Sequence, residues 1–288
     1  MATVYLNGEF VPAERARVSV NDRGYVFGDG IYEVVRVTEG RVFAWDEHAR
    51  RMARGLGEVR IDFNASDVAA LGGVCERLLD DNGLRTGEAT IYLQVTRGAA
   101  PRLHYFPPAG TPPGVYAAPS RFTPSREMRE RGIAAIVLPD IRWSRCDIKT
   151  INLMGAVLGR QAAREAGAYE ALLIRDGMLT EGAATNAFVV LGGVARTYPL
   201  SNYILPGITR QVVIAAARDA GVHVAEEPVT QQQLLAADEV FIVGTTTDVA
   251  PVVTIDGRAV GDGKPGPVTR RVQEAFLARL YGGAHAAR

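Results

Sequence analysis

Apolar and polar positions over the first 120 residues switch between the two-residue period of a strand and the longer period of a helix. Asn7-Gly8 separates two short alternating runs and predicts the turn of a β-hairpin. Asp46 and Ser66 precede amphipathic runs and are typical helix starts. The predicted elements are a hairpin at residues 4–11, strands at 31–37 and 89–96, and helices at 46–56 and 66–82. Because they do not alternate as βαβ units, we expect an α+β domain over residues 1–120.

A proline-rich stretch follows this domain. Residues 102–124 contain six prolines, a density that breaks regular secondary structure. We therefore interpret the stretch as loop and linker, and place the interdomain linker at residues 121–125. The prolines are Pro107, Pro108, Pro112, Pro113, Pro119 and Pro124.

The pattern after the linker mixes buried strands with amphipathic helices. Predicted strands lie at residues 133–138, 171–174, 188–191, 239–243 and 251–255. Predicted helices lie at residues 152–166, 208–220 and 267–280. A larger mixed β/α domain is therefore expected over residues 126–288, and the fold class of the chain is α+β / α/β with two domains.

Composition excludes several classes of function. The formal net charge is zero, so nothing indicates a nucleic-acid or anionic-membrane partner. The two cysteines, Cys75 and Cys146, form neither a zinc-binding spacing nor a disulfide framework. The N-terminus lacks the pattern of a secretion signal, and no apolar run is long enough to span a membrane. We expect a cytoplasmic protein without a metal.

Lysine is nearly absent from the chain. The 32 basic residues include only two lysines, Lys149 and Lys264, and the others are arginines. An arginine stays protonated, whereas an amine can lose its proton and act as a nucleophile or a general base. Ile148, Ile151 and Leu153 surround Lys149, and burial among them would favour the neutral amine. Lys149 is therefore a candidate catalytic residue; the alternative is a chance lysine at a helix start.

Two glycine-containing segments are candidate phosphate sites. Gly207 precedes a predicted helix, so the backbone N–H groups of Ile208 and Thr209 and the Thr209 hydroxyl could hold an anion. Gly244 follows a predicted strand and leads into Thr245, Thr246 and Thr247, which offer hydroxyls and further N–H donors. The alternative for both segments is ordinary capping and turn chemistry.

Three further segments carry groups suited to an aromatic, anionic ligand. Glu181 lies in a predicted turn of small residues, where a carboxylate could pair with a protonated ring nitrogen. Arg102 and His104 could clamp a carboxylate. Tyr32 begins a strand after a glycine-rich turn. The alternatives are a surface glutamate, a solvated loop and a packed core aromatic.

Together these motifs resemble the class IV aminotransferases, which are pyridoxal-phosphate enzymes of fold type IV. The resemblance covers nearly the whole chain and follows the order of the family motifs. The matching segments are Asp22-Arg23-Gly24-Tyr25-Val26-Phe27-Gly28-Asp29-Gly30, Glu47-His48 with Arg51, Asp147-Ile148-Lys149, Thr180-Glu181-Gly182 with Asn186, Gly207-Ile208-Thr209-Arg210, and Gly244-Thr245-Thr246.

The resemblance implies a role for each candidate residue. Lys149 would be the Schiff-base lysine and proton shuttle, and Glu181 the partner of the pyridine nitrogen. Leu205 would pack against the pyridine ring. The cofactor, pyridoxal 5'-phosphate, would have its phosphate held by Arg51, Ile208, Thr209, Thr245 and Thr246.

Within the family the chain is most similar to the D-amino-acid transaminases, which move the amino group between a D-amino acid, such as D-alanine or D-glutamate, and 2-oxoglutarate or pyruvate. Tyr32-Glu33-Val34-Val35 resembles their first strand, and Pro101-Arg102-Leu103-His104 their PRxH motif. The resemblance implies a homodimer in which Arg102 and His104 complete the neighbouring subunit's site. The implied substrate-binding residues are Tyr32, Val34, Arg102, His104 and Thr246.

The chain departs from the best-known members at two places. Ala183-Ala184-Thr185 replaces a serine run, and Pro206 replaces a lysine. The first change removes hydroxyls expected near the cofactor. Alternatives inside the family are an L-branched-chain aminotransferase and, further away, an aminodeoxychorismate lyase or an (R)-amine transaminase. A non-catalytic small-molecule-binding protein of the same fold is the alternative from another class.

Overall fold

The computed structural model describes residues 2–282, and the chain divides into two compact units. The first unit runs to Thr123 and also contains Ile148–Leu153. The second comprises Pro124–Asp147 and the chain from Met154 onward. The segment that carries Lys149 therefore packs with the first unit, although it lies well beyond the linker predicted at residues 121–125. Among the described residues, no helix is both long and apolar enough to cross a membrane.

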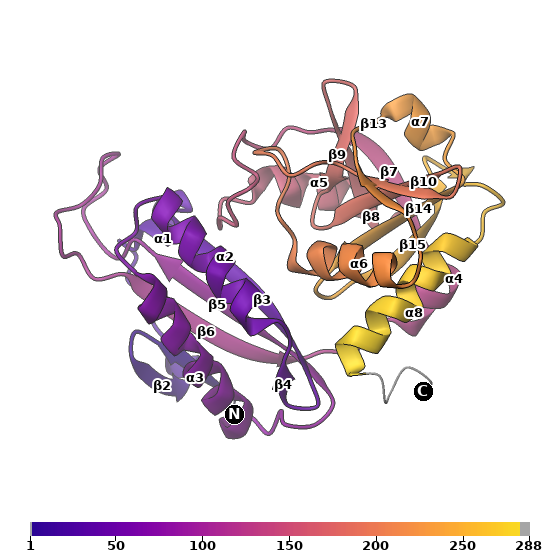
Figure 1. The fold of residues 1–288 in the computed structure, drawn as a ribbon. Coiled ribbons are helices and arrows are strands. Elements are labelled where there is room, and N and C mark those ends of the chain that lie inside the picture. Colours follow the sequence, from indigo (N-terminus) through magenta and orange to yellow (C-terminus); the bar gives the residue numbers. More distant parts are fainter. Residues whose placement is uncertain (1, 283–288) are drawn as a thin grey trace. The chain divides into compact units, whose positions relative to one another are not determined.

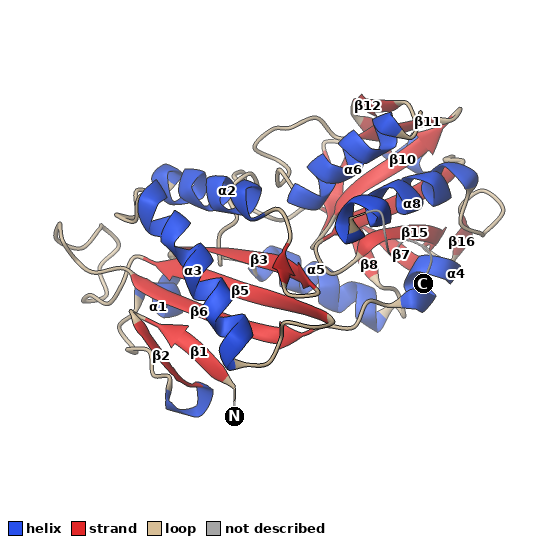
Figure 2. Ribbon diagram, turned by 60° about the horizontal axis from the view of Figure 1, so that its bottom comes forward, coloured by secondary structure: helices blue, strands red, loops and turns tan. Residues whose placement is uncertain are grey.

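The first unit is a six-stranded antiparallel sheet in the order β2-β1-β6-β5-β3-β4. Helices α2 and α3 cover one face, with α2 over β3 and α3 over β1 and β6 (Figures 1 and 2). The apolar residues of these helices and strands form one core, which includes Ile31, Leu56, Leu78 and Ile91. The elements are β1 (Thr3–Leu6), β2 (Glu9–Pro12), η1 (Ala13–Arg15), α1 (Arg23–Phe27), β3 (Gly30–Thr38), β4 (Arg41–Val42), α2 (Trp45–Glu58), α3 (Ala65–Asp81), β5 (Glu88–Thr96) and β6 (Gly114–Arg121).

Strand β6 corrects the interpretation of residues 102–124 as loop and linker. Its eight residues pair with the full length of β5, and Pro119 lies opposite Ile91. On its other side β6 meets β1 only at Tyr116 and Ala117. Pro119 lies past these contacts, where the strand has an open edge and a missing N–H removes no bond to a neighbour. Counting prolines therefore predicted a loop where the sheet tolerates the ring.

The two long helices begin where local capping places them. Asn64 and Asp67 form a capping box, so α3 starts at Ala65. Helix α2 starts at Trp45, after Ala44 in a left-handed conformation, and the predicted cap Asp46 lies inside its first turn. There the carboxylates of Asp46 and Glu47 complement the positive end of the helix.

The second unit is built on a mixed sheet in the order β12-β11-β10-β14-β15-β7-β8-β9-β13, with β16 beside β15. Strand β7 runs parallel to both of its neighbours, and most of the other pairs are antiparallel. Helix α5 packs against β7 and β8, and α4 and α8 pack against β15 (Figure 1). The elements are α4 (Arg126–Arg131), β7 (Ile133–Pro139), α5 (Met154–Glu165), β8 (Glu170–Arg175), β9 (Met178–Gly182), β10 (Asn186–Leu191), β11 (Val194–Thr197), α6 (Ile208–Asp219), β12 (Val224–Glu226), β13 (Val229–Thr230), α7 (Gln231–Leu235), β14 (Glu239–Gly244), β15 (Asp248–Ile255), β16 (Arg258–Ala259) and α8 (Pro267–Tyr281).

A buried charged cluster joins α2 to β3 in the first unit. Both oxygens of Glu33 accept from Arg51, from Nε to Oε1 and from Nη2 to Oε2, each at 2.7 Å. His48 Nδ1 lies 2.7 Å from Glu33 Oε2, and burial lowers the pKa of this imidazole, so its neutral form donates there. Burial alone would raise the pKa of the Glu33 carboxyl, but Arg51 and His48 bring it down to about 2. The helix and the strand are thus held together by an ionised carboxylate in the interior.

Replacing Glu33 by glutamine tests this pairing. The carboxyl titrates at about 4.5 when unperturbed and at about 2 in the fold, so its contribution is complete above pH 4.5 and is lost as the pH falls toward 2. Glu33→Gln removes the charge that balances Arg51 and should lower the free energy of unfolding by roughly 3–5 kcal/mol at pH 7. Urea unfolding should show a smaller difference between the two proteins at pH 3. An equal difference at both pH values would contradict the assignment.

Candidate active site

Lys149 lies in an extended segment against the start of β3. Its carbonyl accepts from Tyr32 N at 3.0 Å, and Ile151 N donates to Gly30 O at 3.0 Å. The alternative of a lysine at a helix start is wrong, because the predicted helix at residues 152–166 begins only at Met154. Gly28 permits the close approach, since its φ is +67° and a Cβ there would lie 3.3 Å from the backbone of Asn152. The backbone thus fixes the position from which the Lys149 side chain projects.

The amine of Lys149 contacts an aromatic ring. Its Nζ lies 4.2 Å from the centroid of the Tyr32 ring, and the side chain is half-buried. Tyr32 stacks on Tyr92 with the ring centroids 5.7 Å apart, and the Tyr92 hydroxyl donates to Gln94 Oε1 at 2.6 Å. Burial raises the pKa of Tyr92 to about 12, so its hydroxyl keeps its proton at neutral pH.

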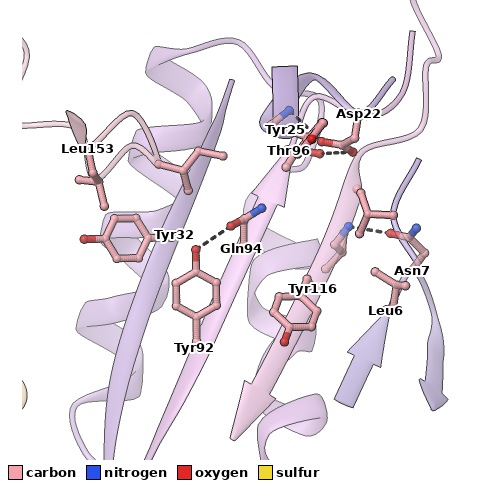
Figure 3. Close-up of a pocket in the computed structure, with 15 residues that line it drawn as sticks. Leu6, Asn7, Asp22, Tyr25, Tyr32, Tyr92, Gln94, Thr96, Tyr116 and Leu153 are labelled. Carbon is pink, nitrogen blue, oxygen red and sulfur yellow. Dashed lines mark hydrogen bonds between the residues drawn. The ribbon is translucent and has the colours of Figure 1, made fainter. Parts of the chain in front are cut away.

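These tyrosines line a pocket of about 450 Å³ in the first unit. Figure 3 shows the rings of Tyr32, Tyr92 and Tyr116 on adjacent strands, with Leu153 next to Tyr32. Sequence analysis singled out Tyr32 but missed Tyr92, Gln94 and Tyr116. The available signal was the two-residue spacing of Tyr92 and Gln94 in a strand whose alternate residues are buried.

The other predicted residues of the first unit occupy separate places. The side chain of Val34 is partly buried in β3, two residues after Tyr32. Arg51 is held by Glu33 within the buried cluster of α2 and β3. Arg102 and His104 lie exposed in the loop between β5 and β6.

Glu181 lies in strand β9, which corrects the predicted small-residue turn. Its side chain is 4% exposed, so the alternative of a surface glutamate is also wrong. Arg142 Nη1 donates to Oε1 at 2.6 Å, and Asn186 Nδ2 donates to Oε2 at 2.7 Å. The backbone N of Leu205 lies 3.2 and 3.1 Å from the two oxygens. Three donors therefore converge on a carboxylate in the interior of the second unit.

Burial and Arg142 act on this carboxyl in opposite directions. Burial raises the pKa of Glu181 to about 7, while the charge and hydrogen bond of Arg142 pull it down. A cationic ring nitrogen facing Glu181 would favour the ionised carboxylate further. The group is thus suited to pair with a protonated aromatic nitrogen.

Sequence analysis missed Arg142 and its support. Asp140 accepts from Arg142 through both oxygens, at 2.9 Å from Nε and 3.0 Å from Nη2. Thr180 Oγ1 lies 3.2 Å and Arg175 Nη2 3.1 Å from Asp140 Oδ2. These partners come from three separate parts of the chain, so the only local signal was two charged residues, Asp140 and Arg142, straight after a buried strand.

The N-terminus of α6 lies beside the buried carboxylate. Asn186 Nδ2 donates to Leu205 O at 3.0 Å as well as to Glu181, which ties the segment before α6 to β9. The helix begins at Ile208 after Gly207, with no side chain capping its first turn. A Cβ on Gly207 would lie 2.1 Å from Asn186 Oδ1, so glycine is required. The first-turn N–H groups, including those of Ile208 and Thr209, can therefore serve an anionic ligand.

The second candidate phosphate segment is the turn between β14 and β15. Thr245 and Thr246 lie in it, and Thr247 N donates to Gly244 O at 3.2 Å to close it. Thr246 is exposed and Thr245 is half-buried. The turn places two hydroxyls at one end of the sheet.

The segment that replaces the serine run is organised by Glu170. This buried carboxylate accepts from Thr185 Oγ1 at 2.9 Å and from Ala184 N at 3.4 Å. The one hydroxyl that the segment retains is therefore directed at Glu170.

These groups fit pyridoxal phosphate, the cofactor that the sequence resemblance implies. Glu181 offers a buried acceptor for a ring N–H, and α6 offers an uncapped helix N-terminus for a phosphate. The half-buried amine of Lys149 can bond to an aldehyde carbon. No group of three or more histidine, cysteine or acidic residues arranged to hold a metal occurs among the described residues.

Comparison with known proteins agrees with this chemistry. The family model described as amino-transferase class IV matches residues 30–255. D-alanine aminotransferases of Staphylococcus aureus (strain COL) and Bacillus licheniformis are each 44% identical, over 96% and 95% of this chain and 97% and 95% of their own lengths.

Solved structures of the same family match nearly the whole chain. The Escherichia coli branched-chain amino acid aminotransferase has a TM-score of 0.91 at 30% identity, covering 98% of this chain and 95% of that one. A branched-chain aminotransferase from T.th., solved with pyridoxamine 5'-phosphate, has a TM-score of 0.86 at 30% identity, covering 99% and 95%. The chain belongs to the class IV aminotransferases and has their two-domain, fold type IV architecture of a small α+β domain and a larger mixed β/α domain.

Proposed function

We propose that this enzyme moves the amino group between a D-amino acid, such as D-alanine or D-glutamate, and a 2-keto acid, 2-oxoglutarate or pyruvate. Transamination with pyridoxal phosphate follows from membership of the family. The observation that carries the choice of enantiomer is the 44% identity to D-alanine aminotransferases over 96% of the chain. The branched-chain enzymes that match in structure are only 30% identical, which makes an L-branched-chain activity the second candidate.

The chain's own residues supply binding and proton transfer. When bound, pyridoxal phosphate provides the electron sink for negative charge at the substrate α-carbon. Lys149 Nζ, as the neutral amine, takes the α-proton and returns it as the ammonium. Tyr32 lies against this amine and limits the directions from which it approaches.

Glu181 and the phosphate ligands hold the cofactor in this proposal. An ionised Glu181 keeps a proton on the ring nitrogen, and its orientation is fixed by Arg142, Asn186 and Leu205 N. Leu205 packs on the ring. The phosphate is held by Arg51, Ile208, Thr209, Thr245 and Thr246, of which Ile208 and Thr209 lie at the uncapped end of α6.

Substrate binding in this proposal uses both subunits of a homodimer. Arg102 and His104, the carboxylate-binding pair, reach from one subunit to the substrate of the other, where Tyr32, Val34 and Thr246 line the site. Their exposure on the first unit supports a role outside their own subunit's core. The arginine fork is suited to two parallel bonds with a carboxylate. We place the reaction in the cytoplasm, where reducing conditions suit the free, buried Cys75 and Cys146.

The enantiomer preference can be measured directly. In single half-reactions followed at the cofactor absorbance, D-alanine should react about 100-fold faster than L-alanine or L-leucine. The reason is that the wrong enantiomer cannot present both its α-proton to Lys149 and its carboxylate to the anchor, and such misplacement costs roughly two orders of magnitude. Faster reaction with L-leucine would instead establish the branched-chain activity.

Arg102→Ala tests the carboxylate-binding pair. Losing a charged hydrogen bond worth roughly 1.5–3 kcal/mol should raise the KM for D-alanine about 10- to 100-fold. Arg131→Ala, which removes an exposed arginine from α4, is the matched control and should leave KM unchanged. Equal KM values in both variants would rule out Arg102 as the anchor.

A further inference from the structure

The loop between β5 and β6 carries the carboxylate-binding pair, yet it contributes little to the core. Leu103, Tyr105 and Phe106 are 44%, 69% and 43% exposed. Apolar burial therefore cannot fix this loop, and a mobile Arg102 would lose binding energy each time it is ordered on a substrate. Some other set of contacts must hold it.

We propose that Arg23 and Asp29 are positioning residues, which hold Arg102 and His104 in the arrangement that binds the substrate carboxylate. The inference rests on the proposed function, because it assigns a support to a pair whose role is itself proposed. Both residues belong to the segment 22–30 that resembles the family motif, and neither has so far been given a role.

The first contact is made between the two members of the pair. Arg23 Nη1 donates to the carbonyl of Leu103, the residue between Arg102 and His104, at 2.7 Å. Arg23 Nε donates to Asp29 Oδ2 at 2.8 Å, and the Arg23 side chain is only 5% exposed. A buried guanidinium, fixed at its other end by a carboxylate, thus grips the backbone at the centre of the motif.

Phe27 forms a platform beneath the pair. The Arg23 guanidinium carbon lies 4.7 Å from the centroid of the Phe27 ring. His104 contacts the same ring at 5.7 Å between centroids, and Arg102 at 5.1 Å. Arg102 and His104 are therefore oriented by one ring, which Arg23 also contacts.

Asp29 connects this contact to a second one on the same loop. Arg97 donates to both Asp29 oxygens, at 2.9 Å and 3.0 Å. The Arg97 guanidinium lies 3.7 Å from the centroid of the Phe106 ring, and Arg60 lies 4.7 Å from it. One carboxylate therefore orients two arginines, of which one holds Leu103 O and the other holds Phe106.

Backbone bonds hold the start of the same loop. Arg23 N donates to Gly98 O at 2.9 Å, and Ala100 N donates to Asn21 O at 3.1 Å. With the loop fixed there, at Leu103 and at Phe106, the residues between these points have little freedom. Lysine at position 23 could not replace arginine, because an ammonium lacks the planar fork that bonds Asp29 and Leu103 O together.

The test measures binding of the carboxylate separately from turnover. Arg23→Met in the holoenzyme should raise the KM for D-alanine about 10- to 100-fold, as expected for a misplaced anchor, and change kcat less than threefold. D-alaninamide, which lacks the carboxylate, should react at the wild-type rate. Arg36→Met is the control, because Arg36 is also buried in the first unit, paired with Glu88 and placed over Phe122. It should leave the ratio of D-alanine to D-alaninamide rates unchanged.

Three further variants keep the inference separable from folding and from the proposed function. Phe106→Ala removes the second contact without leaving a buried charge and should raise the KM for D-alanine about threefold. Arg23→Lys should behave like Arg23→Met. In a double-mutant cycle, Arg23→Met should add nothing to Arg102→Ala, since both act on one interaction.

The outcomes distinguish the two claims. If Arg102→Ala raises KM while Arg23→Met, Arg23→Lys and Phe106→Ala do not, the positioning role is overturned and the carboxylate-binding pair stands. If Arg102→Ala itself has no effect on KM, the proposed pair fails. If Arg36→Met lowers the D-alanine to D-alaninamide ratio as strongly as Arg23→Met, the effect is general destabilisation and the positioning role is rejected.

Discussion

A carboxylate in a protein interior must be matched by charge and hydrogen bonds, and three such groups organise this enzyme. Glu33 is held by Arg51 and His48 and joins α2 to β3. Asp29 is held by Arg23 and Arg97 beneath the loop of the carboxylate-binding pair. Glu181 is held by Arg142, Asn186 and Leu205 N in the larger unit. Each carboxylate fixes an arginine at a place where the proposed chemistry uses a positioned charge.

The use of arginine for nearly every positive charge follows from the same constraint. A guanidinium offers several donors in a plane, so it can bond a carboxylate and a second acceptor together, as Arg23 and Arg142 do. It cannot be deprotonated, and it cannot form the covalent bond to an aldehyde that the cofactor requires. Lys149, packed against Tyr32, is the amine placed for that reaction.

Local sequence patterns predicted much of this structure and failed where distant residues decide. Residues 31–37 and 208–220 have clear periodicity and form β3 and α6 with small shifts at their ends. The proline count concealed β6, because the pairing with β5 that places Pro119 at an open edge is not visible locally. Glu181 lies in β9 for the same reason, since small residues predict a turn unless the neighbouring strand is known.

The candidate site shows the same division. Lys149 was found because lysine is rare in the chain, and the end of α6 because Gly207 precedes an amphipathic run. Arg142, Tyr92 and Gln94 have no local motif. Their roles depend on Asp140, Glu181 and Tyr32, which come near them only in the folded chain.

The central claim is that Lys149 is the amine that bonds the cofactor, and the scarcity of lysine makes it directly testable. The protein is incubated with pyridoxal phosphate, reduced with borohydride and digested, and the modified peptide is identified by mass spectrometry. The account predicts one modification, on the peptide that contains Lys149. Modification of Lys264 alone, or of neither lysine, would contradict it.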